Sequence, residues 1–368
     1  MGDVAVGSLA QPGSLSWWDK APEFHERSMQ SAPGQTDSHC YQFADGFLEI
    51  DSDNDPLNRR FEEIYSEGAV NPRQLHGGLR VGCKVRSLPG LNLSGIAFED
   101  PEILDPAEFC RTLFPDRNYV AGPAGPSGWE TIATADRPYE PLIALKGDRA
   151  LVDARQVWQP FIANYAVNRV LRLQRKVLFF HGASMEISGR GILLVGPKCA
   201  GKTTTSLTLA SRGHGFLGDE IAAVRVGSRA MLPFRRAASI RAGVRAPRVS
   251  ERLDDGNFPK ETFPDGSARV LARVSDLFPG PVVTNARLSC VFFLSRFGAT
   301  PECEKFSFGL EHFRLLTPLA ACMWGVPTGL RMLEMSRMLS GVSCYHLNPG
   351  QPAATAELLE SIAEGLPN

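Results

Sequence analysis

The feature that most constrains this chain is a glycine-rich segment near its centre. It reads Gly196-Pro-Lys-Cys-Ala-Gly201-Lys202-Thr203, the pattern Gly-x-x-x-x-Gly-Lys-Thr. A short apolar run at residues 192–195 precedes it, and a stretch typical of a helix, residues 203–212, follows it. A strand buried on both faces, a glycine-rich loop and a helix, in this order, predict an α/β fold with parallel strands at the loop.

This segment predicts a loop that binds phosphate. Glycines let backbone N–H groups point inward at phosphate oxygens, and the start of the following helix favours negative charge. We expect Lys202 to reach the β- and γ-phosphates of ATP and the Thr203 hydroxyl to ligate Mg²⁺. The residues expected to contact the nucleotide are Gly196, Pro197, Lys198, Cys199, Ala200, Gly201, Lys202, Thr203 and Thr204.

Cys199, inside this loop, is open to two interpretations. A small residue merely fits a tight loop, whereas a thiol at a helix start can have a lowered pKa and react with oxidants. We expect the first role. The other seven cysteines are scattered without a Cys-x-x-Cys pair, which disfavours a zinc site and suits a reducing cytoplasm.

Two acids close the next predicted strand, residues 216–220. Ligands of parallel α/β sheets bind at the carboxyl ends of strands, so we expect this strand beside the one that feeds the loop. Asp219 and Glu220 would then lie near the γ-phosphate. Two acids suggest two tasks: Asp219 as the general base, and Glu220, with Thr203, as a magnesium ligand.

Together these residues resemble the core of the HPr kinase/phosphorylase family. The matching positions are His181-Gly182, the loop at 196–203, Arg212-Gly213-His214 and Asp219-Glu220. The resemblance implies a fold akin to phosphoenolpyruvate carboxykinase, in which the His-Gly strand and the strand entering the loop form a hairpin. It also implies that Asp219 is the base toward an acceptor hydroxyl and that His181 belongs to the active site.

The chain departs from that family in one clear respect. The second family signature, Glu-(Ile/Val)-Arg-Gly-Leu-Gly-Ile, is absent after Glu220, and residues 234–241 stand in its place. The resemblance therefore implies a diverged member, and the acceptor does not carry over. Arg235, Arg236 and Arg241 in this replacement could clamp the transferring phosphoryl group or an acidic acceptor. The alternative is a solvated basic face.

Domain organisation follows from composition and length. A chain of 368 residues suggests roughly two domains. Residues 1–38 are predicted to be a flexible tail, in which Trp17-Trp18 is the one apolar feature. We expect a smaller α+β domain at 39–152 and a P-loop kinase-like domain at 153–368. The first 150 residues do not resemble the family's regulatory domain.

Several secondary-structure elements are predicted as well. The run 51–55 indicates a strand-to-helix turn rather than a calcium loop, because the glycine and glutamate of such loops are missing. Residues 177–187 alternate and predict a single strand. Helices are expected at 57–66, 155–174 and 354–365, and strands at 41–50, 77–85, 93–98, 141–145 and 290–294.

Composition narrows the function. The net charge of −1 gives no general reason to bind nucleic acid, and no apolar run approaches the ~18–20 residues that a bilayer requires. We predict a cytoplasmic ATP-dependent kinase that phosphorylates a hydroxyl of a serine-bearing peptide, a protein or a small molecule. A homo-oligomer stays open. The alternatives are a nucleotide-dependent switch or NTPase, and a nucleotide-binding scaffold without catalysis.

Overall fold

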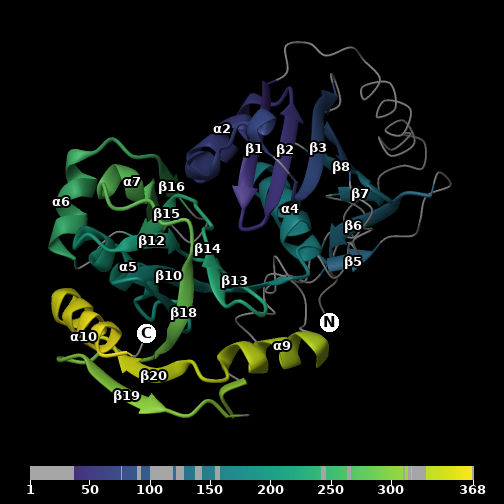
Figure 1. The fold of residues 1–368 in the computed structure, drawn as a ribbon. Helices are drawn as coiled ribbons and strands as arrows, with labels where there is room; N and C mark the ends of the chain where they lie inside the picture. Colours follow the sequence, from purple (N-terminus) through teal and green to yellow (C-terminus); the bar gives the residue numbers. More distant parts are fainter. Residues whose placement is uncertain are drawn as a thin grey trace, which may run out of the picture.

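The computed structural model describes residues 37–75, 77–88, 93–99, 119–121, 128–136, 143–153, 158–241, 246–262, 267–309, 311–313, 316 and 329–366. These residues form a mixed α/β structure with sheets of eight, nine and three strands (Figure 1). Residues 1–36 of the predicted tail, with Trp17-Trp18, lie outside the described residues. None of the helices that are described is long and apolar enough to cross a membrane.

The eight-stranded sheet is built from the first part of the chain. Its pairs are antiparallel except β2–β3, which are parallel and joined through the helix α2 (Asp55–Tyr65). Two short 3-10 turns follow α2: η1 (Ser66–Gly68) and η2 (Pro72–Gln74). The strand order is β1 (Asp37–Phe43), β2 (Gly46–Ser52), β3 (Leu79–Leu88), β4 (Leu93–Glu99), β8 (Arg149–Asp153), β7 (Ile143–Lys146), β6 (Glu130–Thr134) and β5 (Tyr119–Ala121).

Helices α2 and α4 (Trp158–Leu173) pack on this sheet. The side chain of Asn54 caps α2 by accepting a hydrogen bond from the Leu57 N–H at 3.0 Å, which confirms the predicted strand-to-helix turn. The hydrophobic core between these helices and the sheet continues into the second half of the chain. In this core the rings of Phe43 and Phe234 lie 5.3 Å apart.

The nine-stranded sheet carries the glycine-rich segment. Only the β11–β18 and β18–β20 pairs are parallel; every other pair is antiparallel. The strands along its main path are β12 (Gly215–Gly218), β10 (Gly182–Ile187), β11 (Arg190–Val195), β18 (Ala286–Leu294), β14 (Ala230–Leu232), β13 (Ala222–Arg225) and β9 (Val177–Phe180). β20 (Ser343–Asn348) pairs with β18 and with β19 (Glu302–Phe306).

Helices cover both faces of this sheet. Ile192 and Leu194 of β11 belong to a core shared with α5 (Lys202–Ser211) and α10 (Pro352–Glu364). Leu193 and Val195 belong to a core on the other face that includes Met335 and Met338 of α9 (Gly329–Leu339). β11 is therefore buried on both faces, as its continuous apolar run predicts.

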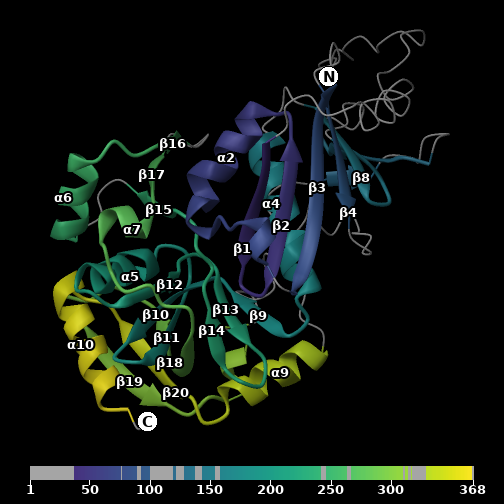
Figure 2. The ribbon, with the colours of Figure 1, turned by 45° about the horizontal axis from the view of Figure 1, so that its top comes forward.

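A three-stranded antiparallel sheet completes the fold, in the order β15 (Ala238–Arg241), β17 (Ala268–Ala272) and β16 (Lys260–Thr262). Short helices α6 (Pro247–Asp255) and α7 (Val274–Leu277) accompany it. Figure 2 shows this sheet between α2 and α5. Arg60 of α2 contacts Glu261 of β16 at 2.5 Å, and Ile240 of β15 packs in the core that contains α5.

Two local predictions were wrong. Residues 177–187 form two strands with different partners, because β9 pairs with β13 whereas β10 pairs with β11 and β12. The break falls at His181, where the N–H of Gly182 donates to the carbonyl of Glu220 at 3.2 Å. In addition, β10 lies between β11 and β12, so the strand that leads to the acids is not the direct neighbour of the loop strand.

Other predictions were confirmed. β10 and β11 form the antiparallel hairpin that the family resemblance implies. Its turn has Ser188 and Gly189 at positive φ, 51° and 80°. Because β12 runs antiparallel to β10, it has the same direction as β11, so both strands end at the same edge of the sheet. Helices α2, α4 and α10 lie where the sequence predicts them.

Candidate active site

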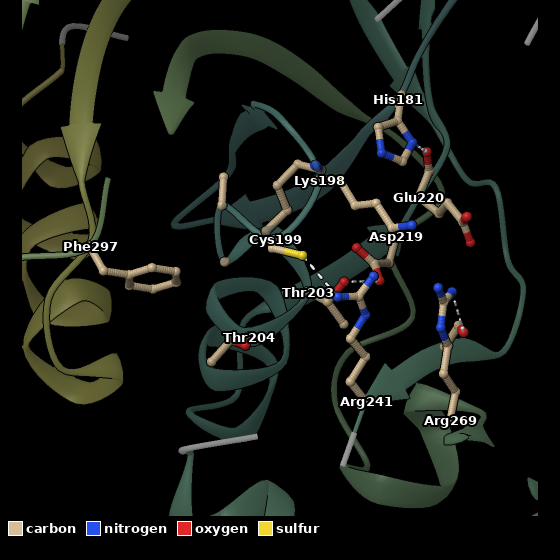
Figure 3. A pocket seen from close by; sticks show the side chains of 14 residues that line it. His181, Lys198, Cys199, Thr203, Thr204, Asp219, Glu220, Arg241, Arg269 and Phe297 are labelled. Carbon is tan, nitrogen blue, oxygen red and sulfur yellow. Dashed lines mark hydrogen bonds between the residues drawn. The ribbon is translucent and has the colours of Figure 1, made fainter. Parts of the chain in front are cut away.

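A cavity of about 500 Å³ opens where β11 and β12 end. Figure 3 shows the side chains that line it. They come from five places: the break before β10, the loop and start of α5, the turn after β12, the small sheet, and the segment after β18 that carries Phe297. The lining residues are His181, Lys198, Cys199, Ala200, Gly201, Lys202, Thr203, Thr204, Asp219, Glu220, Ser239, Arg241, Arg269 and Phe297.

The glycine-rich loop (residues 196–203) has positive φ values at both of its glycines and at Cys199. Gly196 and Gly201 have φ values of 158° and 96°. A Cβ on Gly196 would lie 2.6 Å from the carbonyl oxygen of Leu294, and one on Gly201 would lie 2.8 Å from the ring of Phe297. Gly201 also precedes α5 without a side-chain cap, so the start of the helix is available to an anion in the cavity.

Lys202 is folded back onto this loop. Its Nζ donates to the carbonyl oxygens of Gly196 at 2.8 Å and Pro197 at 3.0 Å, and the residue is only 7% exposed. These contacts place the ammonium group inside the curve of the loop. To bind a phosphate, the ammonium would exchange neutral carbonyl partners for charged oxygens, which form stronger hydrogen bonds.

Asp219 lies directly against the start of α5. The Thr203 hydroxyl donates to its Oδ2 at 2.8 Å, and the residue is 3% exposed. Its other oxygen, Oδ1, is buried and has no hydrogen-bond partner among the described residues. Burial raises the pKa of Asp219 to about 6, although the hydrogen bond from Thr203 opposes this shift.

Glu220 forms the corner that follows Asp219. Its φ of 68° is a left-handed value that non-glycine residues rarely adopt. Its Oε2 is 3.0 Å from Nη1 of Arg236, and this positive charge lowers the pKa of Glu220. Its carbonyl oxygen accepts the Gly182 N–H and lies 3.1 Å from Nδ1 of His181. The corner therefore ties β12 to the break before β10.

His181 lines the cavity as a neutral imidazole. Burial lowers its pKa, and the positive charge of Lys202 lowers it further. Because the carbonyl of Glu220 can only accept a hydrogen bond, Nδ1 of His181 carries the proton in this contact. Nε2 is then left as an acceptor, since a neutral imidazole has one donor and one acceptor nitrogen.

The three candidate arginines lie in three different environments. Arg241 lines the cavity, with Nη1 2.8 Å from the sulfur of Cys199. Arg236 lies behind Glu220 and holds that carboxylate. Arg235, its direct neighbour, points elsewhere: it donates to the carbonyl of Val283 at 3.1 Å and lines a separate cavity of about 410 Å³. Arg235 is thus not brought to the site.

The structure adds residues that sequence reasoning missed. Arg269 of β17 and Ser239 of β15 line the cavity, and Nη1 of Arg269 donates to the Ser239 hydroxyl at 3.3 Å. Phe297, which is 59% exposed, covers the loop at Gly201. No short motif contains these residues. The alternation of β15 is a signal for Ser239 alone, since Ala238 and Ile240 are buried while Ser239 and Arg241 are not.

Comparisons with known proteins give a short local likeness. No protein-family model matches the chain. The chain is 37% identical over 46 residues to the HPr kinase/phosphorylase of Chlorobium phaeovibrioides, a match that spans 12% of this chain and only 14% of that protein. A structure of the Hpr(Ser) kinase/phosphatase from Coxiella burnetii overlaps with 50% of this chain and 93% of its own, at 14% identity and a TM-score of 0.26. The sequence similarity supports an HPr-kinase-like relationship.

Proposed function

We propose that this chain is an ATP-dependent phosphotransferase that moves the γ-phosphoryl group to a hydroxyl of a peptide, protein or small molecule. One observation carries the proposal: the Thr203 hydroxyl at the start of α5 is bonded to the buried carboxylate of Asp219 at 2.8 Å. The pairing joins a phosphate-binding geometry to a carboxylate suited to proton transfer. The local similarity to a protein named HPr kinase/phosphorylase supports the same reaction class.

The residues present fit ATP and Mg²⁺. The left-handed glycines and the uncapped start of α5 suit phosphates. The Thr203 hydroxyl is one of the hard oxygens that Mg²⁺ prefers, and the Asp219 carboxylate that it is bonded to would lie beside the ion. Glu220 is less suited to this role than the sequence suggests, because Arg236 holds its carboxylate. When bound, Mg²⁺ neutralises charge on the phosphates.

Asp219 is our candidate for the general base. With a pKa of about 6 it is mostly ionised at pH 7 yet basic enough to accept a proton. Asp219 takes the hydroxyl proton while the acceptor oxygen bonds to the γ-phosphorus. The bond from that phosphorus to the β–γ bridging oxygen breaks, and ADP leaves with the electron pair. Lys202 stabilises the charge that develops on the phosphates.

His181 and Glu220 have supporting roles in this proposal. The Glu220 carbonyl orients the imidazole of His181, which stays neutral and offers Nε2 to the cavity. Arg236 holds the corner at Glu220 and thereby fixes the neighbouring Asp219. All of these residues fall within the predicted domain at 153–368, which is where we place the reaction.

The decisive experiment replaces Asp219 by asparagine, which keeps the shape and removes the base. Transfer of labelled γ-phosphate to serine peptides and small hydroxyl compounds should fall by about 10²–10⁴-fold, with little change in ATP affinity. Asp276→Asn, in an exposed ion pair outside the cavity, is the matched control. Hydrolysis of ATP without transfer to any acceptor would instead favour a nucleotide-dependent switch. Unchanged transfer in Asp219→Asn would remove the proposal.

A further inference from the structure

The small sheet presents one polar face to the cavity. Ser239 and Arg241 alternate with the buried residues Ala238 and Ile240 along β15, so they share the opposite face. Arg241 pairs directly with Arg269 across the β15–β17 ladder. Both arginines and Ser239 line the same cavity as the glycine-rich loop. Figure 3 shows the Arg241 and Arg269 side chains reaching toward the two acids.

Two arginines opposite each other on one face of a ladder repel, so this arrangement favours a negative charge between them. The glutamates nearby are already bonded to other arginines. Glu220 is 3.0 Å from Arg236, and Glu261, the cross-strand partner of Arg269 on its other side, is 2.5 Å from Arg60. The face therefore brings two arginine side chains to the cavity that Asp219 also lines.

The two arginines lie on a different part of the cavity wall from the residues expected to hold the nucleotide. The phosphates of ATP are expected at the loop amides, Lys202 and the start of α5. Arg269 lies on a different sheet, where it bonds Ser239 and helps to lower the pKa of Glu220. Arg241 lies between the two, in contact with Cys199 of the loop. An anion bound between the two arginines would therefore lie beside the γ-phosphate, on the side of the cavity away from the loop.

We propose that Arg241, Arg269 and Ser239 form a subsite for a carboxylate or phosphate group of the acceptor. The substrate would then be a hydroxyl compound that carries an anionic group close to the hydroxyl that is phosphorylated. A guanidinium binds both anions through paired N–H donors, and Ser239 adds a hydroxyl. This inference rests on the proposed function, because it needs the nucleotide at the loop and Asp219 beside the acceptor.

The first test measures anion binding while the loop is occupied. The full-length chain is saturated with a non-hydrolysable ATP analogue and Mg²⁺, so that the γ-phosphate position is filled, and is then titrated with inorganic phosphate in a calorimeter. We expect one further phosphate to bind, and Arg269→Gln to weaken this binding at least about tenfold. Arg273→Gln, an exposed arginine paired with Asp276, is the control and should bind phosphate like the parent.

The outcomes separate the inference from the proposed function. If the analogue binds but phosphate does not, or if Arg269→Gln binds phosphate as well as the parent, the subsite is overturned and the phosphotransferase proposal stands. The same holds if Arg269→Gln loses the analogue and phosphate equally, because Arg269 then serves the nucleotide. If the analogue itself does not bind, the proposed function fails and the subsite falls with it.

The second test asks which anion the acceptor carries. Transfer from γ-labelled ATP is compared for matched pairs: serine against serinamide for a carboxylate, and glycerol phosphate against glycerol for a phosphate. We expect the anionic member of at least one pair to have a KM at least about tenfold lower, and Arg269→Gln to erase that difference. Equal KM values within both pairs, with measurable transfer, would overturn the subsite.

Discussion

The two sides of the cavity are built in different ways. The loop side consists of consecutive residues, 196–204, whose shape is set by their own glycines and by the helix they open. The side made by Ser239, Arg241 and Arg269 depends on strand register, because Arg269 reaches the cavity only by pairing opposite Arg241. A local motif thus fixes one side, and long-range pairing fixes the other. Variants on the two sides should therefore fail differently.

The largest effect on ATP binding is expected on the loop side. Lys202→Ala removes the buried ammonium that the loop carbonyls hold, so ATP affinity should fall by about a hundredfold or more. Lys198→Ala is the matched control on the same loop, since Lys198 is exposed and should change the affinity only a few-fold. Calorimetry measures both. An unchanged affinity in folded Lys202→Ala would contradict the assignment of the loop.

Asp219 offers a test in which stability and activity move in opposite directions. Its pKa is raised to about 6, above its ordinary value, because the buried site disfavours the charged form. The folded chain therefore binds more protons than the unfolded chain between these two values, and stability falls as the pH rises through that window. Asp219→Asn removes this penalty and should stabilise the fold by about 1–3 kcal/mol at pH 8.

Denaturant unfolding of the parent and Asp219→Asn at pH 8 and pH 4 measures this difference. The stabilisation should be present at pH 8 and largely absent at pH 4, where the parent carboxyl is protonated in the folded state. A variant that is less stable than the parent at pH 8 would show that Asp219 is held by favourable interactions rather than against its burial.

Arg235 and Arg236 form a natural pair of variants. Arg236 is bonded to Glu220, and its guanidinium lies 5.9 Å above the ring of Tyr65 on α2. Arg236→Gln should therefore destabilise the fold by about 1–2 kcal/mol and also reduce transfer, because the corner at Glu220 loosens. Arg235→Gln loses one contact to a carbonyl, so its effect on transfer should be small. Equal loss of transfer in both variants would contradict this contrast.

Sequence reasoning performs well where structure is local and poorly where it is not. The strand-to-helix turn at 51–55 and the start of α5 depend on neighbouring residues, so each could be predicted, and the family resemblance implied the hairpin before the loop. The break at His181 could not, since it depends on a contact with the Glu220 carbonyl. Likewise, nothing in the neighbouring pair Arg235-Arg236 indicates that Arg236 holds Glu220 whereas Arg235 lines a separate cavity.

The smallest expected effect is the pH dependence of transfer, which tests whether Asp219 is the base. Among the residues proposed for the reaction, Asp219 is the carboxylate whose pKa is raised, to about 6. Burial lowers the pKa of His181 and Arg236 lowers that of Glu220, so both shifts point away from neutral pH. If Asp219 must be ionised to accept the proton, kcat/KM should fall about tenfold between pH 7 and pH 5. Arg273→Gln should keep this pH profile, whereas the residual activity of Asp219→Asn should lose it.

A parent profile that is flat from pH 5 to pH 7 would show that the base is not Asp219, even if the loop binds ATP as proposed.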